Sequence, residues 1–265
     1  RRDVGPAVAY TINEFNKMNY SGPMAIIWSD HLMDRVEEFQ KALETGEKLI
    51  VGDPNRFVFI AEKPRFANNN LGWMKLGEKK GEVDAKEYFA FEGWKYKPAQ
   101  DICDEMFSSG NYFWNPGYFI TSVSFLTECY QKLAPEIYEK VTGGNYDEAP
   151  KESFDSAIIE KVDHSSAVIL KTDMGWSDPG TLYALKEALA KNVEDNIAKG
   201  NVIDFETKDS LVYNLEDEKI VAAVGLEGMV VVNTKDAIVI APKDKVVRIS
   251  DLVKFMREKG LEKYL

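Results

Sequence analysis

A short apolar run, a polar tip and an amphipathic helix follow one another near the start of the chain, and this order limits the fold most. Residues 24–28 read MAIIW, a continuous apolar run typical of a strand that is buried on both faces. The run stops at Ser29, Asp30 and His31, and HLMDRVEEFQKALETGEK follows with helical spacing before a second apolar run, LIVG. Strand, helix and strand predict a parallel sheet, in which ligands bind at the carboxyl ends of strands, where Asp30 lies.

The segments that follow predict further strands, some of them antiparallel. They read RFVFIAEKP, WMKLGE, KEYFAFEGWKY, NYFWNPGYFIT with a kink at its Pro-Gly, and SSAVILK. Helical spacing predicts helices over 6–18, 99–110, 122–142 and 152–162. We therefore predict an α/β domain over residues 1–197, with a mixed, mainly parallel sheet flanked by helices.

The texture of the sequence changes after residue 197. Five short β-rich runs come about ten residues apart, separated by polar turns: NVIDF, SLVYN, KIVAAV, MVVVN and AIVIA. Regular short strands without helices between them predict a small β-solenoid or a meander. ISDLVKFMREKG then predicts a closing amphipathic helix with Ser250 as its cap. We expect a second, β-rich domain over residues 198–265.

Composition limits the partners. The chain has 265 residues with 33 basic and 44 acidic side chains, a formal charge of −11, and no cluster of Lys and Arg. Nucleic acid is therefore not expected as a partner, and an acidic protein that handles phosphates needs a local positive patch or a bound cation. Cys103 and Cys129 lack metal-ligand spacing, which is typical of a reduced, cytoplasmic protein. No apolar run approaches the ~20 residues of a membrane span, so we expect no membrane partner.

The corner MGWSDPGTLYALKEALAK, over residues 174–191, has two interpretations. Locally, Ser177 or Asp178 could cap a helix that starts near Pro179. Alternatively, Asp178 and Asp30 together hold Mg²⁺, which is often bound by one or two protein carboxylates while substrate phosphates complete its shell. Spacing alone leaves both interpretations open.

Five segments in order resemble the sugar-1-phosphate nucleotidylyltransferases, and within them the mannose-1-phosphate guanylyltransferase branch. RRDVGPAVAY is similar to Arg-Asn/Asp-Thr-Ala-Pro-Ala-Ile-Ala, and SDHL at 29–32 to the Ala/Ser-Asp-His strand end. The other three segments are FWNPGYF, similar to Trp-Asn-Ser-Gly-Met-Phe, SFDSAIIEKV, similar to Ser-Ile-Asp-Tyr-Ala-Val-Met-Glu-Lys, and GWSDPGTLYAL, similar to Gly-Trp-Ser-Asp-Val-Gly-Ser-Trp. The tail segment VVVNTKDAIVIAPKD resembles Val-Val-Glu-Thr-Lys-Asp-Ala, so the resemblance covers nearly the whole chain.

The resemblance implies a Rossmann-like nucleotide-diphospho-sugar transferase fold with a left-handed β-helix-like tail. It also implies a reaction in which GTP and mannose 1-phosphate give GDP-mannose and pyrophosphate. Asp30 and Asp178 would then hold Mg²⁺, and Lys97 in KYKP would bind the sugar phosphate, although Lys63 in AEKP is a second candidate. The resemblance assigns sugar contacts to Gly72 and Asn115. Trp73 and Trp114 are expected to line the pocket, although aromatic residues at strand positions are more often part of the core.

Several letters depart from the family pattern, and one segment is missing. Tyr96 stands where the family has a Glu, and Met74 where it has a second Gly, so contacts to the sugar are expected to differ. The family's Gly-rich nucleotide loop belongs upstream of residue 1, so the chain is expected to be an N-terminally truncated fragment that is inactive alone.

Two alternative functions remain open at this point. One is a transferase for another sugar 1-phosphate, such as glucose 1-phosphate, and the other is a non-catalytic regulator that binds nucleotide sugars. The β-rich tail either packs on the α/β domain or pairs two copies of the chain as a homodimer.

Overall fold

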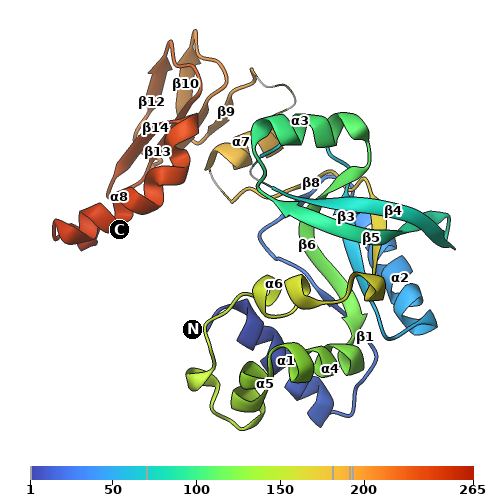
Figure 1. Cartoon of the computed structure of the whole chain (residues 1–265). Helices are drawn as coiled ribbons and strands as arrows, with labels where there is room; N and C mark the ends of the chain where they lie inside the picture. Colours follow the sequence, from blue (N-terminus) through green and yellow to red (C-terminus); the bar gives the residue numbers. More distant parts are fainter. Residues whose placement is uncertain (1, 70, 181, 191, 193) are drawn as a thin grey trace. The chain divides into compact units, whose positions relative to one another are not determined.

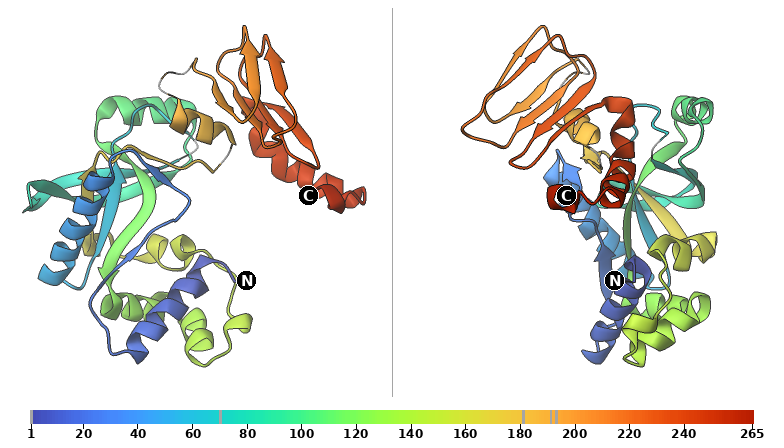
Figure 2. Two further views of the ribbon diagram at one scale, coloured as in Figure 1. Left: turned by 180° about the vertical axis from the view of Figure 1, so that it is seen from behind. Right: turned by 90° about the vertical axis from the view of Figure 1, so that its left-hand side faces the viewer.

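The computed structural model describes residues 2–69, 71–180, 182–190, 192 and 194–265. The chain divides into two compact units, drawn in Figures 1 and 2. The α/β unit comprises Arg1–Ser29 and Met33–Trp176, and the β-rich unit comprises Asp30–Leu32 and Ser177–Leu265. The predicted domain boundary between residues 197 and 198 stays a prediction.

A six-stranded sheet forms the centre of the α/β unit, in the order β1-β6-β3-β7-β5-β4, with a further pairing between β4 and β6. Its strands are β1 (Pro23–Ile26), β3 (Phe57–Glu62), β4 (Gly72–Val83), β5 (Lys86–Tyr96), β6 (Tyr112–Ser122) and β7 (Ala167–Thr172). The mixed sheet that we predicted is confirmed, but its mainly parallel character is wrong for the described strands. Only β3 and β7 pair in parallel, and the other pairings are antiparallel. The prediction was wrong because a continuous apolar run indicates only that a strand is buried on both faces. Burial does not determine whether the strand runs parallel or antiparallel to its neighbours.

Alternate side chains of the central strands enter two separate cores. Phe57 and Phe59 of β3 join one core, whereas Val58 and Ile60 join the other. The first core is covered by α1 (Val4–Lys17), α4 (Val123–Leu133), α5 (Pro135–Thr142) and α6 (Phe154–Ala157), which gather on one side in Figure 1. The second is covered by α2 (Val36–Gly52) and α3 (Gln100–Ser109). The unit is thus a three-layer α/β/α fold, because strands with apolar residues on both faces need a layer on each.

The predicted strand LIVG is wrong, because these residues form the last turn of α2. Leu49 and Ile50 continue the buried face of this helix after Ala42 and Thr45. A run of four apolar residues does not by itself distinguish a strand from a buried helical turn.

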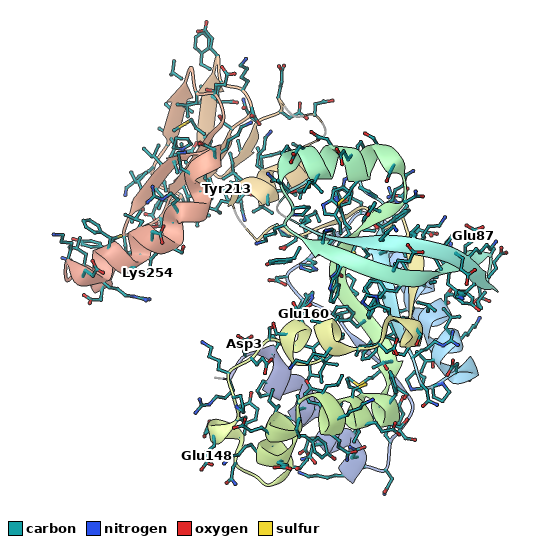
Figure 3. All side chains as sticks on the ribbon, in the orientation of Figure 1. Asp3, Glu87, Glu148, Glu160, Tyr213 and Lys254 are labelled. Atoms are coloured by element: carbon teal, nitrogen blue, oxygen red, sulfur yellow. The ribbon has the colours of Figure 1, made fainter. Side chains whose placement is uncertain are left out.

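The β-rich unit is a small parallel solenoid. Strands β9 (Ile197–Lys199), β11 (Leu211–Asn214) and β13 (Met229–Asn233) pair in parallel, as do β10 (Val202–Phe205) and β12 (Val221–Val224). Register partners are 19 residues apart between β10 and β12 and between β11 and β13, and 14 apart between β9 and β11. Asn233 Nδ2 donates to Asn214 Oδ1 of the preceding coil at 2.8 Å. β14 (Ile238–Pro242) closes this sheet antiparallel to β13. Tyr213 of β11 is labelled in Figure 3, and the Lys199 ammonium lies 5.7 Å from the centre of its ring. Of the two predicted arrangements, the solenoid is the one formed.

Two helices complete the β-rich unit. α7 (Leu182–Leu189) packs Leu182 against Leu211 and Val230 of the solenoid core. It begins at Leu182, later than the predicted start near Pro179. Trp176–Ser177, just before that predicted start, forms a short strand, β8. The predicted cap Ser250 lies inside α8 (Ile249–Glu258), whose N-cap is Arg248, since the 3₁₀ turn Lys243–Arg248 runs directly into the helix.

None of the helices in the described part of the chain has both the length and the apolar composition that a bilayer crossing requires.

Candidate active site

Strand pairing brings three of the predicted site residues together at the start of β4. Gly72 is the register partner of Tyr96 at the end of β5 and of Asn115 in β6. Lys97 follows Tyr96 directly, and its backbone N–H donates to Leu71 O at 3.2 Å. Gly72, Lys97 and Asn115 are therefore neighbours, although they come from three segments of the chain.

Lys97 has an exposed side chain on a strained backbone. Its φ of 44° lies in the left-handed region, which residues other than Gly rarely adopt. Its ammonium lies 5.2 Å from the centre of the Tyr96 ring. Strain of this kind gathers at functional sites, where the surrounding structure maintains it. The other candidate, Lys63, lies at the end of β3, and its ammonium is 4.0 Å from Asp173 Oδ2.

Asn115 sits where β6 bends away from β3. The pairing of β3 with β6 shifts between Ile60 and Glu62, whose partners are Tyr118 and Trp114. The shift lies at the predicted Pro-Gly kink. Asn115 Oδ1 accepts from Gly117 N at 2.8 Å, which fixes the amide and leaves the Nδ2 group as the donor of the side chain.

Trp73 and Trp114 are core residues, with 0% and 1% of their surfaces exposed. Trp73 Nε1 donates to Asn68 O at 2.9 Å, whereas Trp114 Nε1 is buried without a hydrogen-bond partner among the described residues. Their role in sugar contact stays a prediction, and their burial argues against it.

Asp30, His31 and Asp178 form a second group, within the β-rich unit. β2 (Leu32–Met33) pairs with β8, and this pairing joins the chain just after Asp30 to the chain just before Asp178. His31 Nε2 lies 3.8 Å from Asp178 Oδ1. Burial lowers the pKa of His31, and the negative charges of Asp178 and Asp30 oppose that shift. Both carboxylates thus act on one imidazole, although 148 positions of sequence separate them.

The donors in this group suit a hard cation. Two carboxylates are a typical protein share for Mg²⁺, which keeps water or phosphate oxygens in its remaining positions. Across the described residues, no three His, Cys, Asp or Glu side chains gather into a metal-binding group. A cation held by Asp30 and Asp178 would thus rely on oxygens from its substrate or from water.

Glu62 was not among the predicted site residues. Its side chain is fully buried at the end of β3, and its two oxygens accept from Met174 N at 2.8 Å and Trp176 N at 3.1 Å. Arg65 donates to Trp176 O at 3.0 Å and lies 5.3 Å from the centre of the Trp114 ring. The sequence feature that could have identified Glu62 is its position as the only acidic residue of FVFIAE, at the end of an otherwise apolar strand.

Two family models match the chain. Nucleotidyl transferases match residues 1–196, and the mannoseP isomerase/GMP-like β-helix domain matches residues 200–256. Mannose-1-phosphate guanylyltransferase 2 of Escherichia coli O157:H7 is 26% identical over 100% of this chain and 58% of its own length. The alginate biosynthesis protein AlgA of Pseudomonas syringae pv. tomato is 28% identical over 98% of this chain and 55% of its own length. The chain therefore spans little more than half the length of these curated relatives.

A solved structure has the same fold. The mannose-1-phosphate geranyltransferase from Thermus thermophilus superposes with a TM-score of 0.82 at 23% identity, over 97% of this chain and 76% of that chain. The predicted Rossmann-like α/β fold with a C-terminal β-helix is thereby confirmed.

Proposed function

Because this chain belongs to the nucleotidyl transferase family, we propose that it carries the sugar-phosphate and metal-binding parts of a mannose-1-phosphate guanylyltransferase. In the proposed reaction, a phosphate oxygen of mannose 1-phosphate forms a bond to the α-phosphorus of GTP. The bond from that phosphorus to the bridging oxygen breaks, and pyrophosphate leaves with the electron pair. GDP-mannose is the other product. The curated relatives and the β-helix domain support this choice of sugar and base over glucose 1-phosphate or another nucleotide.

Lys97 binds the phosphate of the sugar in this proposal. Both substrates are anionic, so their approach is opposed by repulsion until positive charge lies between them. Reactions of this class depend mainly on positioning and electrostatics, because the protein forms no covalent bond. The exposed ammonium of Lys97, on a segment that neighbours Gly72 and Asn115, meets that need.

Asp30 and Asp178 hold Mg²⁺ in this proposal. Bound there, the cation would neutralise phosphate charge as it develops in the transition state. The observation that supports this assignment most is geometric: β2 pairs with β8, and Asp178 Oδ1 lies 3.8 Å from Nε2 of His31, the residue next to Asp30. An acidic protein can thus handle acidic substrates, since the cation inverts the local sign.

Gly72 and Asn115 recognise the sugar in this proposal. The backbone N–H of Gly72 and the Nδ2 group of Asn115 are donors that suit sugar hydroxyl oxygens. Tyr96, which replaces a family Glu, adjusts the fit of the sugar, whereas Met74, which replaces a family Gly, is buried in the core. We place the reaction in the reducing cytoplasm because Cys103 and Cys129 are both free thiols.

The test is a calorimetric titration of the chain with Mg²⁺ and GDP-mannose, repeated with Asp178→Asn. We expect binding to require Mg²⁺ and to weaken by about tenfold or more in the variant, because it loses one anionic ligand. Binding that ignores both the metal and the substitution would favour the non-catalytic regulator instead. Titration with other nucleotide sugars decides base and sugar choice.

A further inference from the structure

The carboxylate of Glu62 has no part in the roles above, yet it is one of the most enclosed charges of the α/β unit. The other five residues of β3 are apolar and buried, and Glu62 itself is 0% exposed. Burial raises the pKa of Glu62, while hydrogen bonds from the backbone of Met174 and Trp176 oppose that shift. Burial of a carboxyl group costs free energy of folding unless the group is hydrogen-bonded or paired with a charge.

Both oxygens of Glu62 are used on the same short corner. Oε2 accepts from Met174 N at 2.8 Å, and Oε1 accepts from Trp176 N at 3.1 Å. Thr172, the last residue of β7, donates its hydroxyl to Ala61 O at 2.8 Å and lies 3.3 Å from Glu62 Oε2. Both oxygens of the side chain therefore act as acceptors, which an ionised carboxylate provides without a competing O–H donor.

The carbonyls of the same corner are held from the other side. Arg35 N donates to Met174 O at 2.9 Å, and Asp34 N lies 3.4 Å from Gly175 O. Gly175 has a φ of 66°, and a Cβ atom added there would lie 2.7 Å from Asp34 Cβ. The chain after His31 and the chain before Asp178 are thus in direct contact here.

We propose that Glu62 is a positioning residue whose carboxylate fixes the corner Met174–Trp176 and thereby the two chain segments that lead to Asp30 and Asp178. This inference rests on the proposed function, because it gives those aspartates their role in metal binding. Arg65 assists, since it donates to Trp176 O and its guanidinium lies 3.8 Å from Glu62 Oε1.

The decisive variant is Glu62→Gln, which keeps the size of the side chain but replaces one acceptor with an NH₂ donor. Two measurements apply: hydrogen exchange at the Met174 and Trp176 amides, and titration with Mn²⁺ in the presence of mannose 1-phosphate, followed by electron paramagnetic resonance. We expect at least one of the two amides to exchange faster and the Mn²⁺ affinity to fall about tenfold.

Thr121→Val is the matched control. Thr121 is also fully buried in the sheet, and its hydroxyl donates to Arg56 O at 2.9 Å, opposite Phe57 at the other end of β3. The Thr121→Val substitution removes a buried hydrogen bond but leaves the contacts of Met174–Trp176 unchanged. We expect a loss of thermal stability with unchanged Mn²⁺ affinity and unchanged exchange at Met174 and Trp176.

If Glu62→Gln leaves both amides and the Mn²⁺ affinity as in the wild type, the positioning role is refuted while the proposed function stands. If the wild type itself binds no Mn²⁺, or Asp178→Asn binds it equally well, the proposed function fails and takes the metal role of Glu62 with it. Should Glu62→Gln fail to fold, Arg65→Met provides the same two readouts, and it is expected to show a smaller shift of the same kind. Unchanged readouts in Arg65→Met would then refute the positioning role.

Discussion

In the proposed site, Gly72, Lys97 and Asn115 have different groups to present to a sugar phosphate. Gly72 lacks a side chain, Lys97 holds an ammonium on a strained turn, and Asn115 keeps its Nδ2 donors. Tyr96 is the register partner of Gly72, and Lys97 is the next residue along the chain. Substitutions at these positions therefore separate binding from folding.

Gly72→Ala is expected to fold as well as the wild type and to bind mannose 1-phosphate more weakly. A Cβ atom at this position would lie 3.4 Å from Asn115 Cβ and 3.9 Å from Tyr96 Cδ2, which are ordinary contacts. Ala is about 0.5–1 kcal/mol more favourable than Gly within a strand, so the melting temperature should not fall. Calorimetric titration measures the affinity, and an unchanged affinity would remove Gly72 from the sugar site.

Lys97→Met should weaken mannose 1-phosphate binding by about ten- to a hundredfold, since a hydrogen bond to a charged group contributes roughly 1.5–3 kcal/mol. Lys95→Met is the matched control, because Lys95 is also exposed near the end of β5 but pairs in register with Trp73. The same titration with both variants decides the matter. Equal losses in the two variants would mean that only the overall charge matters.

Among the helices and strands, buried ionic contacts connect α7 to the solenoid. Lys186 of α7 is fully buried, and its ammonium lies 2.6 Å from Asp209 Oδ1. Lys243 reaches the other oxygen of Asp209 at 2.6 Å, from the 3₁₀ turn that follows β14. One carboxylate therefore ties together three segments of the β-rich unit.

Asp209→Asn is expected to destabilise the β-rich unit by about 3 kcal/mol, because it removes the carboxylate that faces the buried charge of Lys186. Glu227→Gln is the control, since Glu227 forms an exposed pair with Lys208 at 3.1 Å and its loss should change nothing measurable. Urea unfolding followed by circular dichroism compares the two. Similar midpoints for both variants would show that the buried pair adds no stability.

The contact between α2 and β5 should depend on pH. Glu38 of α2 accepts from Lys86 of β5 at 2.8 Å and from Lys41 at 3.0 Å, and these bonds lower its pKa from the usual 4.5 to about 2. The folded state therefore binds this proton less tightly than the unfolded state, so the stabilisation is present above pH 4.5 and lost as the pH falls toward 2. The difference in melting temperature between wild type and Glu38→Gln should shrink as the pH falls from 4.5 toward about 2. A constant difference would contradict this mechanism.

For the chain as a whole, the sequence predicted the order of elements well and the contacts of the backbone poorly. The apolar run 24–28 and the solenoid could be recognised because their patterns are local, although β1 ends at Ile26, before Asp30. Glu62 could not, since its partners are backbone N–H groups more than 110 positions away, and no side-chain pattern encodes them. The helical form of LIVG was missed for a related reason, because four apolar residues fit a strand and a helical turn equally well.

The proposed reaction depends on Asp30 and Asp178 sharing one divalent cation beside a sugar phosphate. The most direct measurement is the paramagnetic relaxation of the ³¹P resonance of mannose 1-phosphate by Mn²⁺ bound to the chain. We predict strong relaxation with the wild type and its loss in both Asp30→Asn and Asp178→Asn. Excess Mg²⁺ should also abolish the relaxation in the wild type, because it displaces Mn²⁺ from the site. Relaxation that persists in either variant would contradict the shared site, because that carboxylate would then not be needed to hold the cation.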